Sequence, residues 1–157
     1  MGSFSFELKD HHDYLVKLNA EYADLENEPL SSRHAVNFAM TAYHMCEWVW
    51  HNEPRVNGNP TYSRPMDFYA AVNAACPAIP IMRDLTNGSK HTQITRGTPI
   101  VDGTELHEGT FDDTFDDTFD VTALLISMVD GSKRTFFREA TEAVEFWRRL
   151  FVNGFKP

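Results

Sequence analysis

The chain has few cysteines, no long apolar run and no basic residue in its most acidic stretch. Two cysteines, Cys46 and Cys76, are too few to build a disulfide framework in 157 residues. The unbroken apolar runs are only a few residues long, whereas about 20 residues are needed to span a bilayer. The first residues, MGSFSFE, have neither the basic nor the apolar part of a signal peptide. We therefore expect a cytoplasmic protein with no membrane partner.

Apolar residues are nevertheless abundant enough for one core. Hydrophobic residues make up 42% of the chain and aromatic residues 13%, which excludes a disordered composition. A chain of this length can bury roughly 70% of its unfolded surface. We expect residues 1–157 to form a single domain.

The first half of the chain has apolar residues at helical spacings of three and four. Helices are predicted over about 5–27, 33–51, 63–76 and 80–88, with N-caps at Ser31 or Ser32 and at Ser63, and with a left-handed end at Asn87–Gly88. Residues 52–59 are predicted to be a loop. Together, residues 5–91 are expected to form a helical bundle.

The second half of the chain favours strands. Strands are predicted over 92–101, 121–129 and 132–137, with a type I′ turn at Asp130–Gly131 and a last helix over 141–153 that begins at Thr141 and ends at Asn153–Gly154. The predicted fold class is α+β and mainly α. It comprises about four helices, a small antiparallel sheet within 92–137, and a C-terminal helix, the last two being additions to the bundle.

Most of the negative charge lies in one segment, 102–120. It holds eight acidic residues and no Lys or Arg, which leaves the rest of the chain nearly neutral. Its end is a repeat, TFDDTFDDTFD, over 110–120, which lacks the Gly and the final Glu of a calcium-binding loop. The segment is predicted to be a surface loop, and one interpretation is that it binds a basic protein partner.

The predicted second helix carries polar residues along one face. Asn37, Thr41, His44, Trp48 and His51 follow one another at spacings of three and four. This face is interpreted as the wall of a polar binding site or as a solvated helix face. A third interpretation is a metal site in which His44, Glu47 and His51 join His11, His12 or Asp13 from the first helix.

A second polar cluster spans residues 83–91, RDLTNGSKH. Arg83 and Lys90 are suited to stabilising charge on a phosphate, and His91 to proton transfer near neutral pH. An RNA 2′-hydroxyl would be the nucleophile, so no metal and no cofactor is expected, and Asn87 would help to bind the substrate. The alternative is a helix end at which Lys90 and His91 cap the last carbonyls.

Arg83, Asp84 and His91 resemble the motif of the HEPN superfamily, in which an Arg and a polar residue precede a His by four to six residues. Seven residues separate Arg83 from His91, one more than the usual range. Members are often metal-independent ribonucleases of toxin–antitoxin and phage-defence systems that work as dimers with the motif at the interface. The resemblance covers about residues 5–91. It implies that Arg83 and His91 are catalytic and that Asp84 orients Arg83.

These observations leave three functions open. The first is an HEPN-like, metal-independent ribonuclease or its inactive relative, with RNA as substrate and a homodimer as the assembly. The second is a non-enzymatic binding or inhibitory protein that uses segment 102–120. The third is a metal-binding helical bundle. Convergence of Arg83, His91 and the His44 face in one cleft would favour the enzyme.

Overall fold

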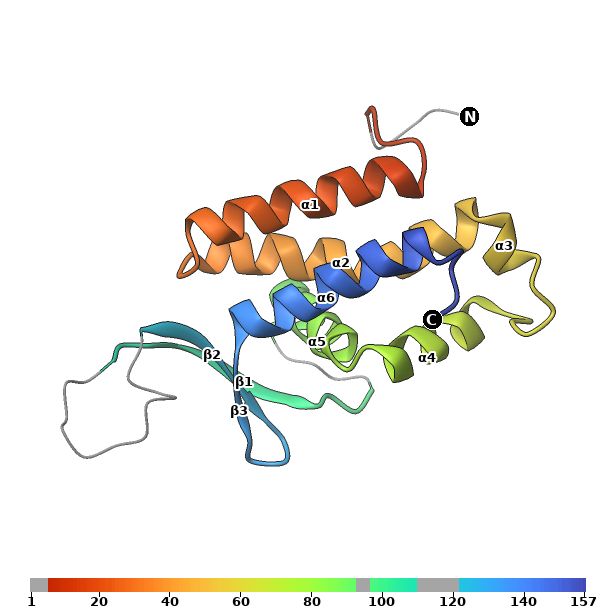
Figure 1. The fold of residues 1–157 in the computed structure, drawn as a ribbon. Coiled ribbons are helices and arrows are strands. Elements are labelled where there is room, and N and C mark those ends of the chain that lie inside the picture. The colour runs from red at the N-terminus through yellow and green to blue at the C-terminus, as the bar shows by residue number, and fades with distance from the viewer. Residues whose placement is uncertain (1–5, 93–96, 110–121) are drawn as a thin grey trace.

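The computed structural model describes residues 6–92, 97–109 and 122–157. These residues form six helices and a three-stranded antiparallel sheet (Figure 1). The helices are α1 (His11–Asn27), α2 (Ser32–Asn52), α3 (Pro54–Asn57), α4 (Pro65–Ala75), α5 (Ala78–Lys90) and α6 (Phe136–Val152), and the strands are β1 (Val101–His107), β2 (Ala123–Met128) and β3 (Lys133–Thr135). The α+β, mainly α fold class is confirmed. Among the described helices, none has the length and apolar character needed to cross a membrane.

Helices α1 and α2 run in opposite directions side by side (Figure 1). Asp10 begins α1, because its side chain accepts hydrogen bonds from the backbone N–H groups of His12 and Asp13. The helix therefore starts at His11, several residues later than predicted. Ser31 caps α2 as expected.

The last helix completes the bundle. α6 packs against α1, α2 and α5, and its Trp147 is fully buried. The Trp147 indole N–H donates to the backbone oxygen of Ala42 at 3.0 Å, which ties α6 to the middle of α2. Other fully buried side chains come from three helices and one strand: Leu18, Leu25, Phe38, Met45, Ile79, Met82 and Ile126. The C-terminal helix, which we expected to be an addition to the bundle, is thus part of the core.

Two helix starts between α2 and α5 differ from the prediction. The predicted loop over 52–59 contains α3, because Glu53 caps this single turn with its carboxylate. At the start of α4, a side chain inside the helix caps the residues that precede it. The Asp67 carboxylate accepts the backbone N–H groups of Ser63 and Arg64, so Arg64 occupies the N-cap and Ser63 does not cap the helix.

Helix α5 runs through its predicted end. Asn87 and Gly88 lie in its last turn, and Gly88 does not adopt a positive φ. The N–H of His91 still donates to the oxygen of Asn87, so the regular hydrogen-bond pattern continues to Lys90. The predicted left-handed end at Asn87–Gly88 was wrong.

The three strands pair in the order β1–β2–β3, so β1 and β3 are the edges of the sheet. Leu125 in β2 lies between Glu105 in β1 and Thr135 in β3. The register shifts between Val101 and Gly103, which marks a bulge in β1.

The position of β1 corrects two predictions. The strand begins at Val101, where the strand predicted over 92–101 should end, and it occupies the start of the predicted loop over 102–120. β2 offers β1 a full antiparallel partner, and this pairing outweighs the charged, Gly-containing sequence of β1. The repeat over 110–120 lies outside the described residues.

The turn after β2 is confirmed, but its type differs. Gly131 adopts φ +85° and Asp130 does not adopt a positive φ, whereas a type I′ turn needs positive φ at both. The N–H of Gly131 donates to the oxygen of Met128 at 2.9 Å. The connection is therefore a type I-like turn followed by a left-handed glycine.

Helix α6 follows β3 without a linker. It begins at Phe136, after Thr135, so the predicted start at Thr141 was wrong. The Thr141 hydroxyl donates to the oxygen of Phe137 inside the helix. At the other end, Gly154 has a positive φ and the N–H of Phe155 donates to the oxygen of Leu150. This Schellman arrangement confirms the predicted end.

Candidate functional site

Asp84 is the most firmly held polar side chain on α5. Its Oδ1 accepts hydrogen bonds from Nε and Nη2 of Arg83 at 3.0 and 2.8 Å. Its Oδ2 accepts the backbone N–H groups of Ile100 at 2.6 Å and Val101 at 3.2 Å. Asp84 is only 4% exposed. One buried carboxylate therefore orients Arg83 and also fixes the start of β1, and we name this arrangement the Asp84 clasp.

Arg83 is held in place by the clasp but remains accessible, with 31% of its side chain exposed. Its positive charge also affects the ionisation of Tyr43 in α2. Burial raises the pKa of Tyr43, and the positive charge of Arg83 partly opposes this rise. A fixed, partly exposed guanidinium is the kind of group that binds a phosphate with defined geometry.

Three of the predicted residues share one side of α5. At 100° per residue, Arg83, Asn87 and Lys90 fall within about 60° of one another. The charge of Lys90 affects His44 of α2. Burial lowers the pKa of His44, and the charges of Lys90 and Lys17 lower it further, whereas the charge of Glu47 raises it. We call Tyr43, His44, Glu47, Arg83, Asn87 and Lys90 the α2–α5 surface.

His91 lies at the outer end of this surface. It is the C-cap of α5 and is exposed, and its side chain makes no hydrogen bond or ion pair with another described residue. It follows Arg83 by eight positions, which is about 12 Å along a helix axis. Within the described chain, neither His91 nor Lys90 donates a side-chain hydrogen bond to a carbonyl at the end of α5. The alternative that these two side chains cap the helix is therefore not supported.

The polar face predicted on α2 is divided between two environments. Thr41 is buried against α1, where its Oγ1 accepts from Nζ of Lys17 at 2.6 Å. Trp48 stacks on Tyr14 of α1 with ring centroids 4.7 Å apart. This half of the face joins two helices and does not line a binding site. The remaining members are Asn37 and His44, which are half-buried, and His51, which is exposed.

The residues of the predicted metal site are not brought together. Within the part of the chain that the structure describes, no three His, Cys, Asp or Glu side chains are placed to hold one ion. His11 instead lies against Glu53, with Nε2 and Oε2 3.2 Å apart, and Arg55 binds the same carboxylate. The geometry therefore gives no support to a metal-binding bundle.

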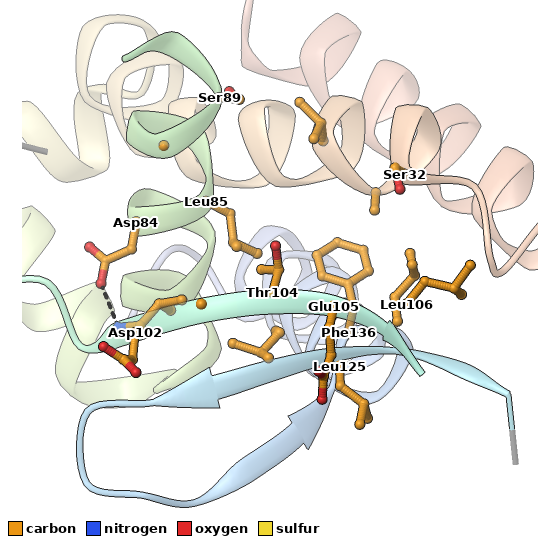
Figure 2. Close-up of a pocket in the computed structure, with 17 residues that line it drawn as sticks. Ser32, Asp84, Leu85, Ser89, Asp102, Thr104, Glu105, Leu106, Leu125 and Phe136 are labelled. Carbon is orange, nitrogen blue, oxygen red and sulfur yellow. Dashed lines mark hydrogen bonds between the residues drawn. The ribbon is translucent and has the colours of Figure 1, made fainter. Parts of the chain in front are cut away.

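A groove that the sequence did not reveal lies between the sheet and the helices. Its volume is about 500 Å³, and five elements line it (Figure 2). Its apolar lining includes Val36 of α2, Leu85 of α5, Leu106 of β1, Leu124 of β2 and Phe136 of α6. We call it the β1 groove. Residues so far apart in the chain leave no local pattern from which such a groove could be found.

Comparisons with protein families, curated proteins and solved structures found no match to this chain. The α2–α5 surface and the β1 groove are the two candidate sites, and Arg83, His44 and His91 do not line the β1 groove.

Proposed function

We propose that the α2–α5 surface cleaves RNA without a metal, as an HEPN-like ribonuclease that works as a homodimer in phage–host conflict. The observation that supports this proposal is the Asp84 clasp. A buried carboxylate holds Arg83 at the surface of α5 in a fixed orientation, on the same side of the helix as Asn87 and Lys90.

Each residue then has a role in phosphodiester cleavage. The RNA 2′-oxygen attacks the neighbouring phosphorus, and the bond from phosphorus to the 5′-oxygen breaks. Arg83 stabilises the charge that develops on the phosphate oxygens. His91 takes the proton from the 2′-hydroxyl or supplies one to the leaving 5′-oxygen, and water carries the other of these two protons. Lys90 and Asn87 bind the backbone, and His44 lines the site.

The proposal is tested by cleavage of a varied pool of single-stranded RNA in EDTA. Arg83→Ala should lower the rate on the order of 10²- to 10³-fold, and His91→Ala roughly 10²- to 10⁴-fold. His44→Ala should have a smaller effect. Arg83→Lys retains the charge without the two-point bond to Asp84, and should also lose most activity if the orientation of the guanidinium matters.

Two matched controls lie on exposed surface elsewhere. Arg138→Ala removes an exposed arginine of α6, and His12→Ala removes an exposed histidine of α1. Both should cleave as the wild type does. Circular dichroism of each variant separates loss of activity from loss of fold. Absence of EDTA-resistant cleavage by the wild type, or wild-type rates in Arg83→Ala and His91→Ala, would refute the proposal.

A further inference from the structure

The free edge of β1 faces away from β2. Strand β1 is an edge of the sheet, and every second residue of an edge strand directs its N–H and C=O groups outward. Between residues 102 and 106 no backbone bond joins this outer side to another described segment. These backbone groups can accept a further strand.

The β1 groove runs along this edge. Figure 2 shows Thr104, Leu106 and Phe136 in the space between β1 and α2, and Leu124 and Ile126 of β2 also line this space. Leu106 is 53% exposed although its partner in β2, Leu124, packs against the core. The apolar face of the sheet therefore continues past the helices that cover the rest of it.

The chemistry of the groove suits peptide side chains. Its lining is mainly apolar, and three hydroxyl groups, from Ser32, Ser89 and Thr104, lie among the apolar residues. Pockets of this size and character typically hold apolar groups that a few polar atoms orient. A strand alongside β1 would place alternate side chains in the groove and the others in solvent.

The charge beside this edge is negative. Asp102 and Glu105 line the groove from β1 and are exposed. Lys133 pairs with Glu105 at 2.9 Å, whereas Asp102 makes no ion pair with a described residue. Both carboxylates belong to the acidic segment 102–120, which contains no Lys or Arg. A basic strand complements this edge, whereas a second copy of β1 would set like charges side by side.

The edge is also fixed before any partner arrives. The Asp84 clasp holds the N–H groups of Ile100 and Val101, so β1 enters the sheet at a defined position. A partner strand then does not bear the entropy of ordering β1, which favours binding.

We propose that β1 binds a basic, extended peptide segment of a partner protein as a fourth strand, with its apolar side chains in the β1 groove and its Lys or Arg side chains near Asp102 and Glu105. Strand addition of this kind takes affinity from backbone hydrogen bonds and specificity from alternate side chains. This surface adjoins the proposed ribonuclease site, because Asp84 lines the β1 groove and also orients Arg83.

The test uses three fluorescent probes and the full-length protein. The first is Lys-Val-Lys-Val-Lys-Val-Lys, the second has Glu in place of Lys, and the third is the Lys peptide with alternate backbone nitrogens methylated. We expect the Lys peptide to bind in fluorescence anisotropy, more weakly as salt rises. The Glu and methylated peptides should each bind at least about tenfold more weakly, and the amide NMR signals of 102–106 should shift.

Two protein variants locate the site. Asp102→Lys with Glu105→Lys should weaken binding of the Lys peptide about tenfold or more. The matched control, Glu142→Lys with Glu145→Lys, reverses two exposed charges on α6 and should not. Equal binding of all three peptides, equal loss in the control, or no binding at all would overturn the proposal. So would a dimer in ultracentrifugation that the charge reversal dissociates, because it would show that a second copy occupies the edge.

Discussion

In the helical body, Trp147, Phe38 and Leu18 are fully buried where α6, α2 and α1 meet, whereas β1 is attached to α5 by the carboxylate of Asp84. The helices bury large apolar side chains from several directions, so no single polar contact determines their positions. The edge strand buries little of its own sequence and relies on its pairing with β2 and on the clasp. The contrast implies that the helices tolerate loss of a polar contact and that β1 does not.

Removal of the central indole should give the largest loss of stability. Trp147→Ala leaves a cavity among α1, α2 and α6 and frees the backbone oxygen of Ala42. We expect the free energy of unfolding to fall by about 3–5 kcal/mol, as measured by urea denaturation. Trp147→Phe should lose less, because the ring retains much of the packing. A loss below about 1 kcal/mol would contradict the idea that apolar burial holds the body.

Removal of the Asp84 carboxylate should affect β1 more than the helices. Asp84→Ala leaves the N–H groups of Ile100 and Val101 and the Arg83 guanidinium without their acceptor. The cost should be about 1.5–3 kcal/mol. Hydrogen exchange should show a faster rate at the β1 amides while α1 and α6 remain protected.

The control for this experiment is Asp130→Ala. It removes an exposed carboxylate that also accepts a backbone N–H, that of Ser132 in the turn. It should leave the exchange of β1 unchanged. Equal acceleration of exchange in α1, α6 and β1 by Asp84→Ala would show that the strand and the helices unfold as one unit. It would refute the idea that β1 depends on the Asp84 contact more than the helices do.

Acid should have a smaller, graded effect on the body through the pair of His11 and Glu53. Burial, then the neighbouring His12, lowers the pKa of His11 below its ordinary 6.5. The unfolded chain therefore binds a proton at higher pH than the folded chain does, and stability falls as pH drops below about 6.5. Hydrogen bonds from Arg55 lower the pKa of Glu53 from 4.5 to about 2, so its contribution is complete above pH 4.5 and is lost on the way to pH 2.

Melting temperatures between pH 5 and pH 8 test this effect. His11→Gln should flatten the dependence on pH without abolishing it, because burial also lowers the pKa of His44. The exposed neighbour His12 supplies the matched variant, and His12→Gln should change the slope less. An unchanged slope in His11→Gln would show that His11 does not carry the acid sensitivity.

The sequence predicted the long elements because their signals are local. The start of α2, the end of α6 and the presence of β2 follow from Ser31, from Asn153–Gly154 and from a run of β-branched and apolar residues. The strand β1 did not follow, because its stability comes from pairing with β2. The start of α6 was misplaced because Thr141 is a good cap by type but lies within the helix.

The candidate site was predictable only in part. The resemblance to the HEPN motif implied that Asp84 orients Arg83, and the hydrogen bonds between them agree with this. It did not indicate that the other oxygen of Asp84 holds β1, because Ile100 lies 16 positions away. Nor did periodicity show that Thr41 and Trp48 face α1, since polar and aromatic residues suit both a binding surface and a helix interface.

The central position of α6 has a consequence for synthesis of the protein. Trp147 enters the core from α6, the last helix of the described residues, about 100 residues after α2 ends. At a translation rate of roughly 5–20 residues per second, α6 is completed on the order of 5–20 s after α1 and α2. During that interval Phe38, fully buried in the finished fold, lacks its ring contact with Phe136 of α6. The nascent helices therefore expose apolar surface until α6 has been made.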